Sequence, residues 1–78
     1  MTKRTEGRLR ILYVQDILRA CPGPGHAITM AQLLSLLGER GISAERRSLY
    51  DDFRQLERYG MQVARTSRGR YSRYYWKR

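Results

Sequence analysis

Hydrophobic residues recur every three or four positions in the first part of the chain, which is the spacing of one helix face. That face consists of Ile11, Val14, Ile17 and Leu18. The run of two prolines and two glycines over residues 22–25 ends the periodicity. The pattern predicts a helix over residues 8–20, preceded by a flexible N-terminus over residues 1–7.

The same spacing returns after a short gap and predicts a second helix over residues 29–40. Its apolar face consists of Met30, Leu33, Leu34 and Leu37. Thr29 is the expected N-cap, because its side-chain oxygen can accept from a free backbone N–H of the first turn. Gly41 is the expected stop signal. Ile28, just before the helix, fits a very short strand.

A third helix is predicted over residues 44–59, with Ser43 as its N-cap and Gly60 as its end. Its core stripe consists of Leu49, Phe53 and Leu56. The opposite face is rich in charge. Ile42, in the turn before this helix, is expected to be buried.

After Gly60 the period changes from helical to alternating, which is typical of strands. Met61, Val63 and Arg65 alternate with the residues between them. Residues 67–70 form the predicted turn, in which Gly69 takes a positive φ, and residues 71–76 form a second strand. On this second strand, Tyr74 and Trp76 share the face that we expect to be buried.

These elements predict one domain over residues 8–78, mainly α with a small β-hairpin. Three helices precede the hairpin, and the third helix follows the second after a short turn. This order is that of a three-helix winged helix-turn-helix.

Positive charge is concentrated in the second half of the chain. The 78 residues include 16 Lys and Arg against 7 Asp and Glu, a net charge of +9. Eleven of the basic residues follow residue 39, and the segment from Gly60 onward contains six basic residues and no acidic one. Arginine, which predominates, forms bidentate hydrogen bonds to phosphate and to guanine. This distribution predicts a nucleic-acid partner.

Length and composition argue against several other classes of protein. A chain of 78 residues has no room for a large enzyme with its own deep cleft, so we expect no catalytic activity and no cofactor. Cys21 and His26 are too few for a zinc site, which needs about four ligands. No apolar run approaches the roughly 20 residues of a membrane span. We therefore expect a cytoplasmic, nucleoid-associated protein.

The candidate DNA-binding residues lie on the third helix and on the hairpin. At the helix start, the N-terminus capped by Ser43, together with Arg46, is expected to receive a phosphate. The exposed helix face would contact base edges and phosphates through Arg47, Ser48, Tyr50, Asp51 and Arg54. The hairpin would follow the backbone or enter a minor groove through Arg65, Arg68, Arg70 and Arg73.

The run Gly41-Ile42-Ser43-Ala44-Glu45-Arg46-Arg47-Ser48-Leu49-Tyr50-Asp51-Asp52-Phe53 resembles the N-terminal winged helix-turn-helix of WYL-domain transcriptional regulators, relatives of DeoR-type bacterial repressors. Residues 8–18, residues 29–33 and the Tyr74-Tyr75 pair are similar to other parts of that domain. The resemblance implies sequence-specific binding to double-stranded DNA, with Arg47, Ser48 and Tyr50 at the family's usual contact positions.

The chain departs from that family in two respects. Asp51 stands where the family commonly has a basic residue, and it could accept from a cytosine amino group or hold its arginine neighbours in place. The family's WYL ligand-sensing domain has no counterpart here. The chain is therefore expected to be either a fragment of a longer regulator or a standalone domain.

Other functions compete with sequence-specific DNA binding. The tyrosines and arginines also suit a non-specific binder of RNA or single strands, in which bases stack on aromatic rings. A winged helix can also serve as a protein-interaction module that docks an acidic partner. Leu9, Leu12 and Tyr13 form a second apolar stripe on the first helix, which is a homodimer contact, a surface packed against the hairpin or simply an exposed surface.

Overall fold

Three helices and a three-stranded antiparallel sheet make up the fold. The computed structural model describes the backbone of residues 3–68 and 70–77, and the side chains of residues 8–67 and 70–77. In chain order the elements are α1 (Lys3–Arg19), the 3₁₀ turn η1 (Pro24–His26), β1 (Ile28–Thr29), α2 (Met30–Glu39), α3 (Arg46–Tyr59), β2 (Val63–Arg68) and β3 (Tyr71–Trp76).

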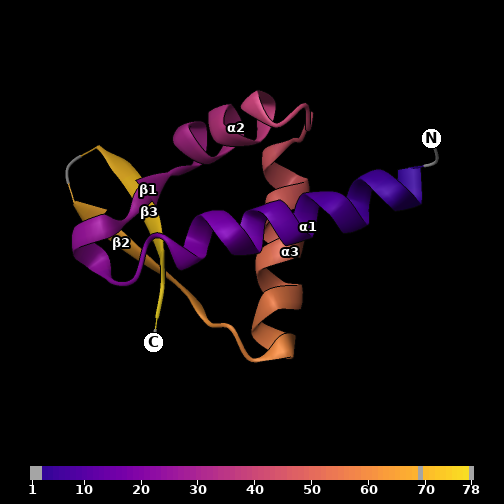
Figure 1. Cartoon of the computed structure of the whole chain (residues 1–78). Helices are drawn as coiled ribbons and strands as arrows, with labels where there is room; N and C mark the ends of the chain where they lie inside the picture. The colour runs from indigo at the N-terminus through magenta and orange to yellow at the C-terminus, as the bar shows by residue number, and fades with distance from the viewer. Residues whose placement is uncertain (1–2, 69, 78) are drawn as a thin grey trace.

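Helix α1 crosses α3, α2 lies above the crossing, and the sheet stands to one side (Figure 1). The three predicted apolar stripes meet where the helices cross. Their central members, Val14, Leu33 and Leu49, are completely buried, and Ile42 is buried between α2 and α3 as predicted. The helix periodicity of the sequence therefore identifies the core correctly.

The sheet contains the predicted hairpin and one further strand. Strands β2 and β3 pair antiparallel from Val63↔Trp76 to Arg68↔Tyr71. The short strand predicted at Ile28 is confirmed as β1, and it adds to the free edge of β3. The positive φ expected at Gly69 lies outside the described residues. Tyr74 is buried as predicted, whereas Trp76 is half-buried against the core.

Helix α2 begins as the sequence predicts. The Thr29 hydroxyl accepts from the Gln32 N–H at 3.1 Å, and the Gln32 side-chain oxygen accepts from the Thr29 N–H at 2.9 Å. This reciprocal capping box satisfies two backbone donors at the helix start. Helix α3 ends at Gly60, whose φ of 114° suits a glycine C-cap.

The starts of the other two helices differ from the prediction. Helix α1 begins at Lys3, five residues early, because no proline precedes Arg8 and the single Gly7 costs only about 1 kcal/mol of helix propensity. Ser43 is not the N-cap of α3, which begins at Arg46 with Glu45 at the cap position and no side-chain cap hydrogen bond. The chain stays non-helical through residues 42–45, so that Ile42 and Ala44 both reach the core while Ser43 faces solvent.

Within residues 3–68 and 70–77, none of the helices has the length and apolar character needed to cross a bilayer.

Candidate nucleic-acid interface

A groove of about 510 Å³ runs between the start of α2, the start of α3 and the hairpin. Three elements far apart in sequence meet here because β3 pairs with β1, which leads directly into α2, while Tyr50, one turn into α3, packs against Tyr74 of β3. The groove is lined by Thr29, Met30, Ala31, Gln32, Arg46, Tyr50, Arg65, Arg70, Tyr71, Ser72, Arg73 and Tyr74.

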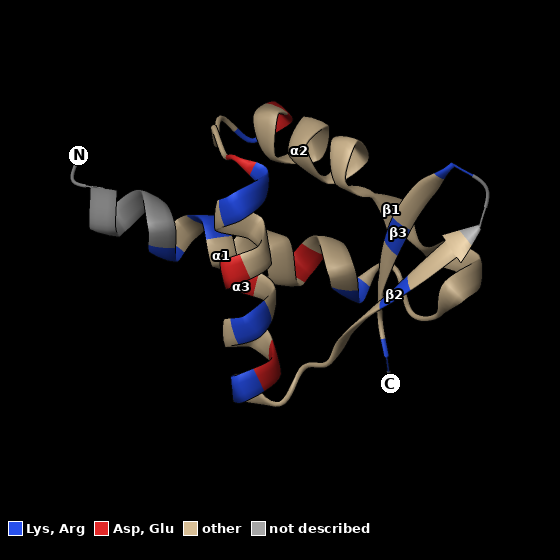
Figure 2. Ribbon diagram, turned by 180° about the vertical axis from the view of Figure 1, so that it is seen from behind, with Lys and Arg blue, Asp and Glu red and all other residues tan. Residues whose placement is uncertain are grey.

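The charge of the groove has a single sign. Of the described residues that line it, four are arginines and none is acidic. Arg46 comes from α3, Arg65 from β2, Arg73 from β3 and Arg70 from the turn between the strands. In Figure 2, basic residues mark both α3 and the hairpin on the face where α3 lies in front of α1. An acid-free concave surface of this kind attracts anions.

Two tyrosine hydroxyls meet at the floor of the groove. The hydroxyl oxygens of Tyr50 and Tyr74 lie 3.2 Å apart. The rings of Tyr50 and Tyr74 also form a cluster with Phe53, whose centroid is 5.1 Å from that of Tyr74. The pKa of Tyr74 is raised to about 12, mainly by burial and to a smaller extent by the hydrogen bond with Tyr50. Both contacts attach α3 to the hairpin and fix one wall of the groove against the other.

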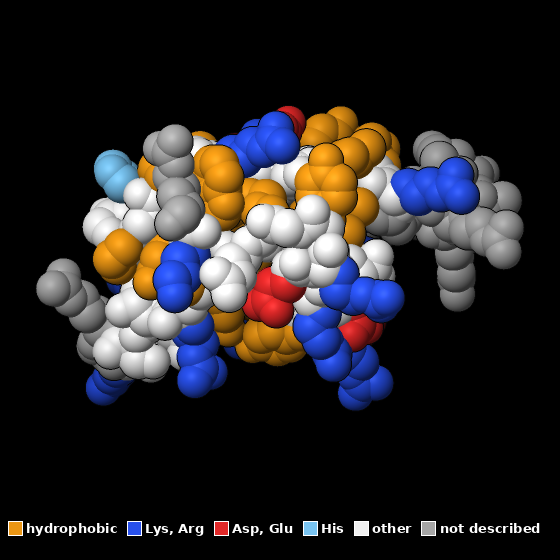
Figure 3. Space-filling view, turned by 90° about the horizontal axis from the view of Figure 1, so that it is seen from below, with side chains coloured by type: hydrophobic (Ala, Val, Ile, Leu, Met, Phe, Trp, Pro, Cys, Tyr) orange, Lys and Arg blue, Asp and Glu red, His pale blue; other side chains and the backbone are white. Residues whose placement is uncertain are grey.

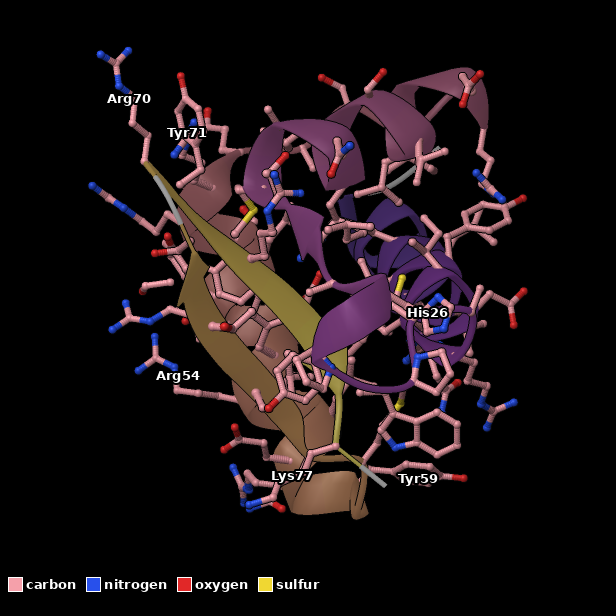
Figure 4. All side chains as sticks on the ribbon, turned by 90° about the vertical axis from the view of Figure 1, so that its left-hand side faces the viewer. His26, Arg54, Tyr59, Arg70, Tyr71 and Lys77 are labelled. Carbon is pink, nitrogen blue, oxygen red and sulfur yellow. The ribbon has the colours of Figure 1, made fainter. Side chains whose placement is uncertain are left out.

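The outer face of α3 lies beside the groove rather than in it. Arg47 and Arg54 are exposed, and Ser48 is half-buried. The Arg54 Nη2 donates to the Asp51 Oδ1 at 2.7 Å. Asp51 therefore holds Arg54, one of the two neighbours proposed for it from the sequence. Figure 4 shows Arg54 and the hairpin-tip residue Arg70 projecting from the same side of the molecule.

The structure brings together some of the predicted site residues and separates others. The groove contains five of them, Arg46, Tyr50, Arg65, Arg70 and Arg73. Ser43 lies in a separate shallow hollow against the end of α2, and the side chain of Arg68 lies outside the described residues. The sequence did not predict that the first turn of α2 would form a wall of the groove. The short connection between α2 and α3 could have indicated that the two helices lie close together.

An ion pair that positions α3 was also missed. Asp52 is 2% exposed, and it accepts from the Arg10 Nε at 2.7 Å and from the Arg10 Nη2 at 3.0 Å. The hydrogen bond to Asp52 raises the pKa of Arg10. This bidentate contact ties α3 to α1 just beneath the exposed arginine face.

Cys21 and His26 take no part in the groove. The buried Cys21 thiol donates to the Ile17 carbonyl oxygen at 3.3 Å, and burial raises its pKa. His26 projects from η1, on the opposite side of the view from Arg54 (Figure 4). Among the described residues, no cluster of three or more His, Cys, Asp or Glu could hold a metal ion.

No protein-family model matches this chain, and no curated protein or solved structure matches it. The likeness to WYL-type regulators therefore stays a prediction from short motifs. What the chain does is inferred below from the residues of the groove and their arrangement.

Proposed function

We propose that the chain is a winged helix-turn-helix domain that binds double-stranded DNA sequence-specifically, as all or part of a transcriptional regulator in the bacterial cytoplasm. The observation that carries the proposal is the groove between α3 and the hairpin, with its four arginines and no acidic residue among the described lining. A phosphodiester backbone is the abundant polymer whose charge complements such a surface. The domain would act by binding alone, without catalysis or a cofactor.

In this proposal α3 enters the major groove and the hairpin follows the backbone or the minor groove. An α-helix with its side chains is about 10–12 Å wide, which matches a major groove about 12 Å wide. Arg47 and Arg54 project from the exposed face of α3, and the ion pair with Asp51 holds the Arg54 guanidinium in a defined direction. The buried Arg10–Asp52 pair supports the same helix from behind.

One feature favours a second candidate, binding of single-stranded nucleic acid. Tyr71 is 64% exposed at the start of β3, beside Arg70 and Arg73 in the same groove. An exposed ring between guanidinium groups can stack on an unpaired base. This candidate predicts little sequence preference and a large loss of affinity when Tyr71 is replaced.

The first experiment is selection of bound duplexes from a random pool at physiological salt, where non-specific binding is weak. We expect one enriched motif. Retention of all duplexes alike, together with tighter binding of single strands, would favour the second candidate.

Arg47→Ala tests the assignment of α3. If Arg47 contacts guanine, the variant is expected to bind the selected motif about 1–3 kcal/mol more weakly and to discriminate less at one position. The control is Arg58→Ala, which removes the same charge from the last turn of α3. Equal behaviour of the two variants on the motif would contradict a base contact by Arg47.

The proposed DNA-bound form is a homodimer formed through α1. Leu12 is 57% exposed and lines a shallow hollow with Leu56 and Tyr59 of α3, and Leu9 is exposed on the same helix. Tyr13 instead packs against the core, 5.9 Å below the guanidinium of Arg40, so it belongs less to this contact than the sequence suggests. Hydrophobic side chains reach the surface near the N-terminal part of α1 in Figure 3, apart from the basic edge.

Charge supports a second copy of the chain as the occupant of this face. Arg8 and Asp16 are both exposed, four residues before and after Leu12, so each lies about 40° from it around the helix. In a two-fold antiparallel pair of α1 helices centred on Leu12, Arg8 comes level with Asp16 of the second copy. The face is therefore complementary to itself.

A further inference from the structure

The hydroxyl groups of Tyr50 and Tyr74 carry two protons, and the hydrogen bond between them uses only one. Each tyrosine carries one O–H donor, and only one proton can lie between the two oxygens of Tyr50 and Tyr74. The other proton must point elsewhere. Which hydroxyl holds it depends on what surrounds each oxygen.

Burial assigns the donor in this pair. Tyr74 is 7% exposed and lies among the rings of Phe53 and Tyr50, whereas Tyr50 is 42% exposed at the groove. A buried hydroxyl needs a partner for its proton, and the Tyr50 oxygen is the partner the structure gives it. Tyr74 therefore donates to Tyr50, and the Tyr50 proton points toward the groove.

Two guanidinium groups share this part of the groove. Arg46 lies one helical turn before Tyr50, and Arg65 pairs with Tyr74 across the sheet. Both arginines are near enough to Tyr74 that their charge acts to lower its pKa, against the larger effect of burial. Two positive charges and a neutral O–H donor thus converge on one volume. That donor set suits an anionic oxygen, because charge-assisted O–H···O⁻ and N–H···O⁻ bonds are the strong ones.

We propose that Tyr50, Arg46 and Arg65 form a subsite for one backbone phosphate of the bound nucleic acid. The proposal rests on the proposed function and makes it more specific. Tyr50 is then a phosphate contact that also joins α3 to the hairpin, rather than a residue that reads a base edge. Its hydroxyl is positioned by Tyr74, so that α3 and the hairpin bind the same phosphate together.

Tyr50→Phe tests this subsite, because it removes the outward proton, together with the oxygen that accepts from Tyr74, and leaves the ring and all charges in place. We expect about tenfold weaker binding to every duplex, with unchanged base preference and an unchanged dependence on salt. Tyr59→Phe is the matched control, since the Tyr59 hydroxyl lies at the far end of α3 and outside the groove. Thermal unfolding of both variants checks that the fold is retained.

A phosphate scan locates the contact. A series of duplexes, each with one neutral methylphosphonate, is bound to the parent protein and to Tyr50→Phe. We expect one position at which the methylphosphonate costs the parent more affinity than it costs Tyr50→Phe, because the two arginines still contact that phosphate in the variant. Equal affinities of Tyr50→Phe and Tyr59→Phe for all duplexes would overturn the subsite. So would a larger loss for Tyr74→Phe than for Tyr50→Phe, because the outward proton would then belong to Tyr74.

Failure of the proposed function has a different outcome. A parent protein that binds no duplex and no single strand would overturn nucleic-acid binding itself. Titration with inorganic phosphate then tests the subsite alone, through the side-chain N–H resonances of Arg46 and Arg65. These resonances are expected to shift in the parent and to shift less in Tyr50→Phe. Equal shifts in the two proteins would overturn the subsite as well.

Discussion

At the scale of single residues, two neighbouring aspartates of α3 have opposite surroundings. Asp51 is exposed and pairs with Arg54 one turn later, so solvent screens the interaction. Asp52 is buried and receives two hydrogen bonds from Arg10, which lies 42 positions earlier in the chain. The two ion pairs therefore differ in what their loss leaves behind: an exposed carboxylate that water can solvate, or a buried one that it cannot.

The difference predicts unequal effects on stability. Arg10→Met is expected to lower the free energy of unfolding by about 3–5 kcal/mol, because it leaves the Asp52 carboxylate buried without its counter-ion. Arg54→Met, the matched control, is expected to change it by about 0–1 kcal/mol. Urea unfolding measures both.

A double variant shows whether the lost stability comes from the uncompensated charge of Asp52. Arg10→Met combined with Asp52→Leu removes both charges and is expected to recover most of the stability lost in Arg10→Met. If the double variant is no more stable than the single one, an uncompensated charge is not the cause of the loss.

At the scale of elements, α1 has one face in the core and one in solvent. Val14 and Leu18 are completely buried, whereas Leu12 lies on the opposite side between two charges of opposite sign. An exposed leucine by itself needs no explanation. The arrangement of Arg8 and Asp16 at equal distances from it supports the proposed antiparallel pairing of two copies.

Charge exchange tests this pairing of helices. Arg8→Glu and Asp16→Arg each place like charges together at both ends of the pair, so each is expected to weaken the dimer about tenfold. The combined variant restores opposite charges and is expected to dimerise like the parent, whereas Arg58→Glu serves as a control outside this face. Sedimentation equilibrium measures the parent and all four variants, and a combined variant as monomeric as the single ones would contradict the antiparallel arrangement.

At the scale of the whole molecule, the net charge of +9 is unevenly distributed over the surface. Several basic side chains gather along the lower edge of the view in Figure 3, while others lie at its top and right, and four arginines line the groove. An anionic polymer would therefore experience a local field rather than only the net charge. Removing one positive charge inside the groove and one outside it distinguishes a local field from the effect of the net charge.

Salt dependence measures the local contribution. Arg65→Gln is expected to reduce the slope of log affinity against log salt concentration by about one unit, because one phosphate contact is lost. Arg19→Gln removes the same charge at the end of α1, outside the groove, and is expected to leave the slope unchanged. Equal slopes for the two variants would mean that net charge alone drives binding.

The sequence by itself determined the elements that depend on neighbours a few residues away. The periodicity of Val14, Leu18 and their counterparts defined three helices and their buried faces. Thr29 and Gly60 marked helix ends through contacts made within one turn. Alternation after Gly60 identified both strands, because side chains of a strand alternate between its faces.

Tertiary structure alone decided the contacts between residues far apart in the chain. Asp52 is on the buried side of α3 because Arg10 of another helix supplies its counter-charge. Tyr50, expected to face outward, holds its hydroxyl against Tyr74, 24 residues away on a strand. Ser43 is not a cap because its neighbours on both sides pack into the core. Periodicity shows which face of a helix is apolar, but the partner that makes a polar residue stable in the interior comes from how the elements pack.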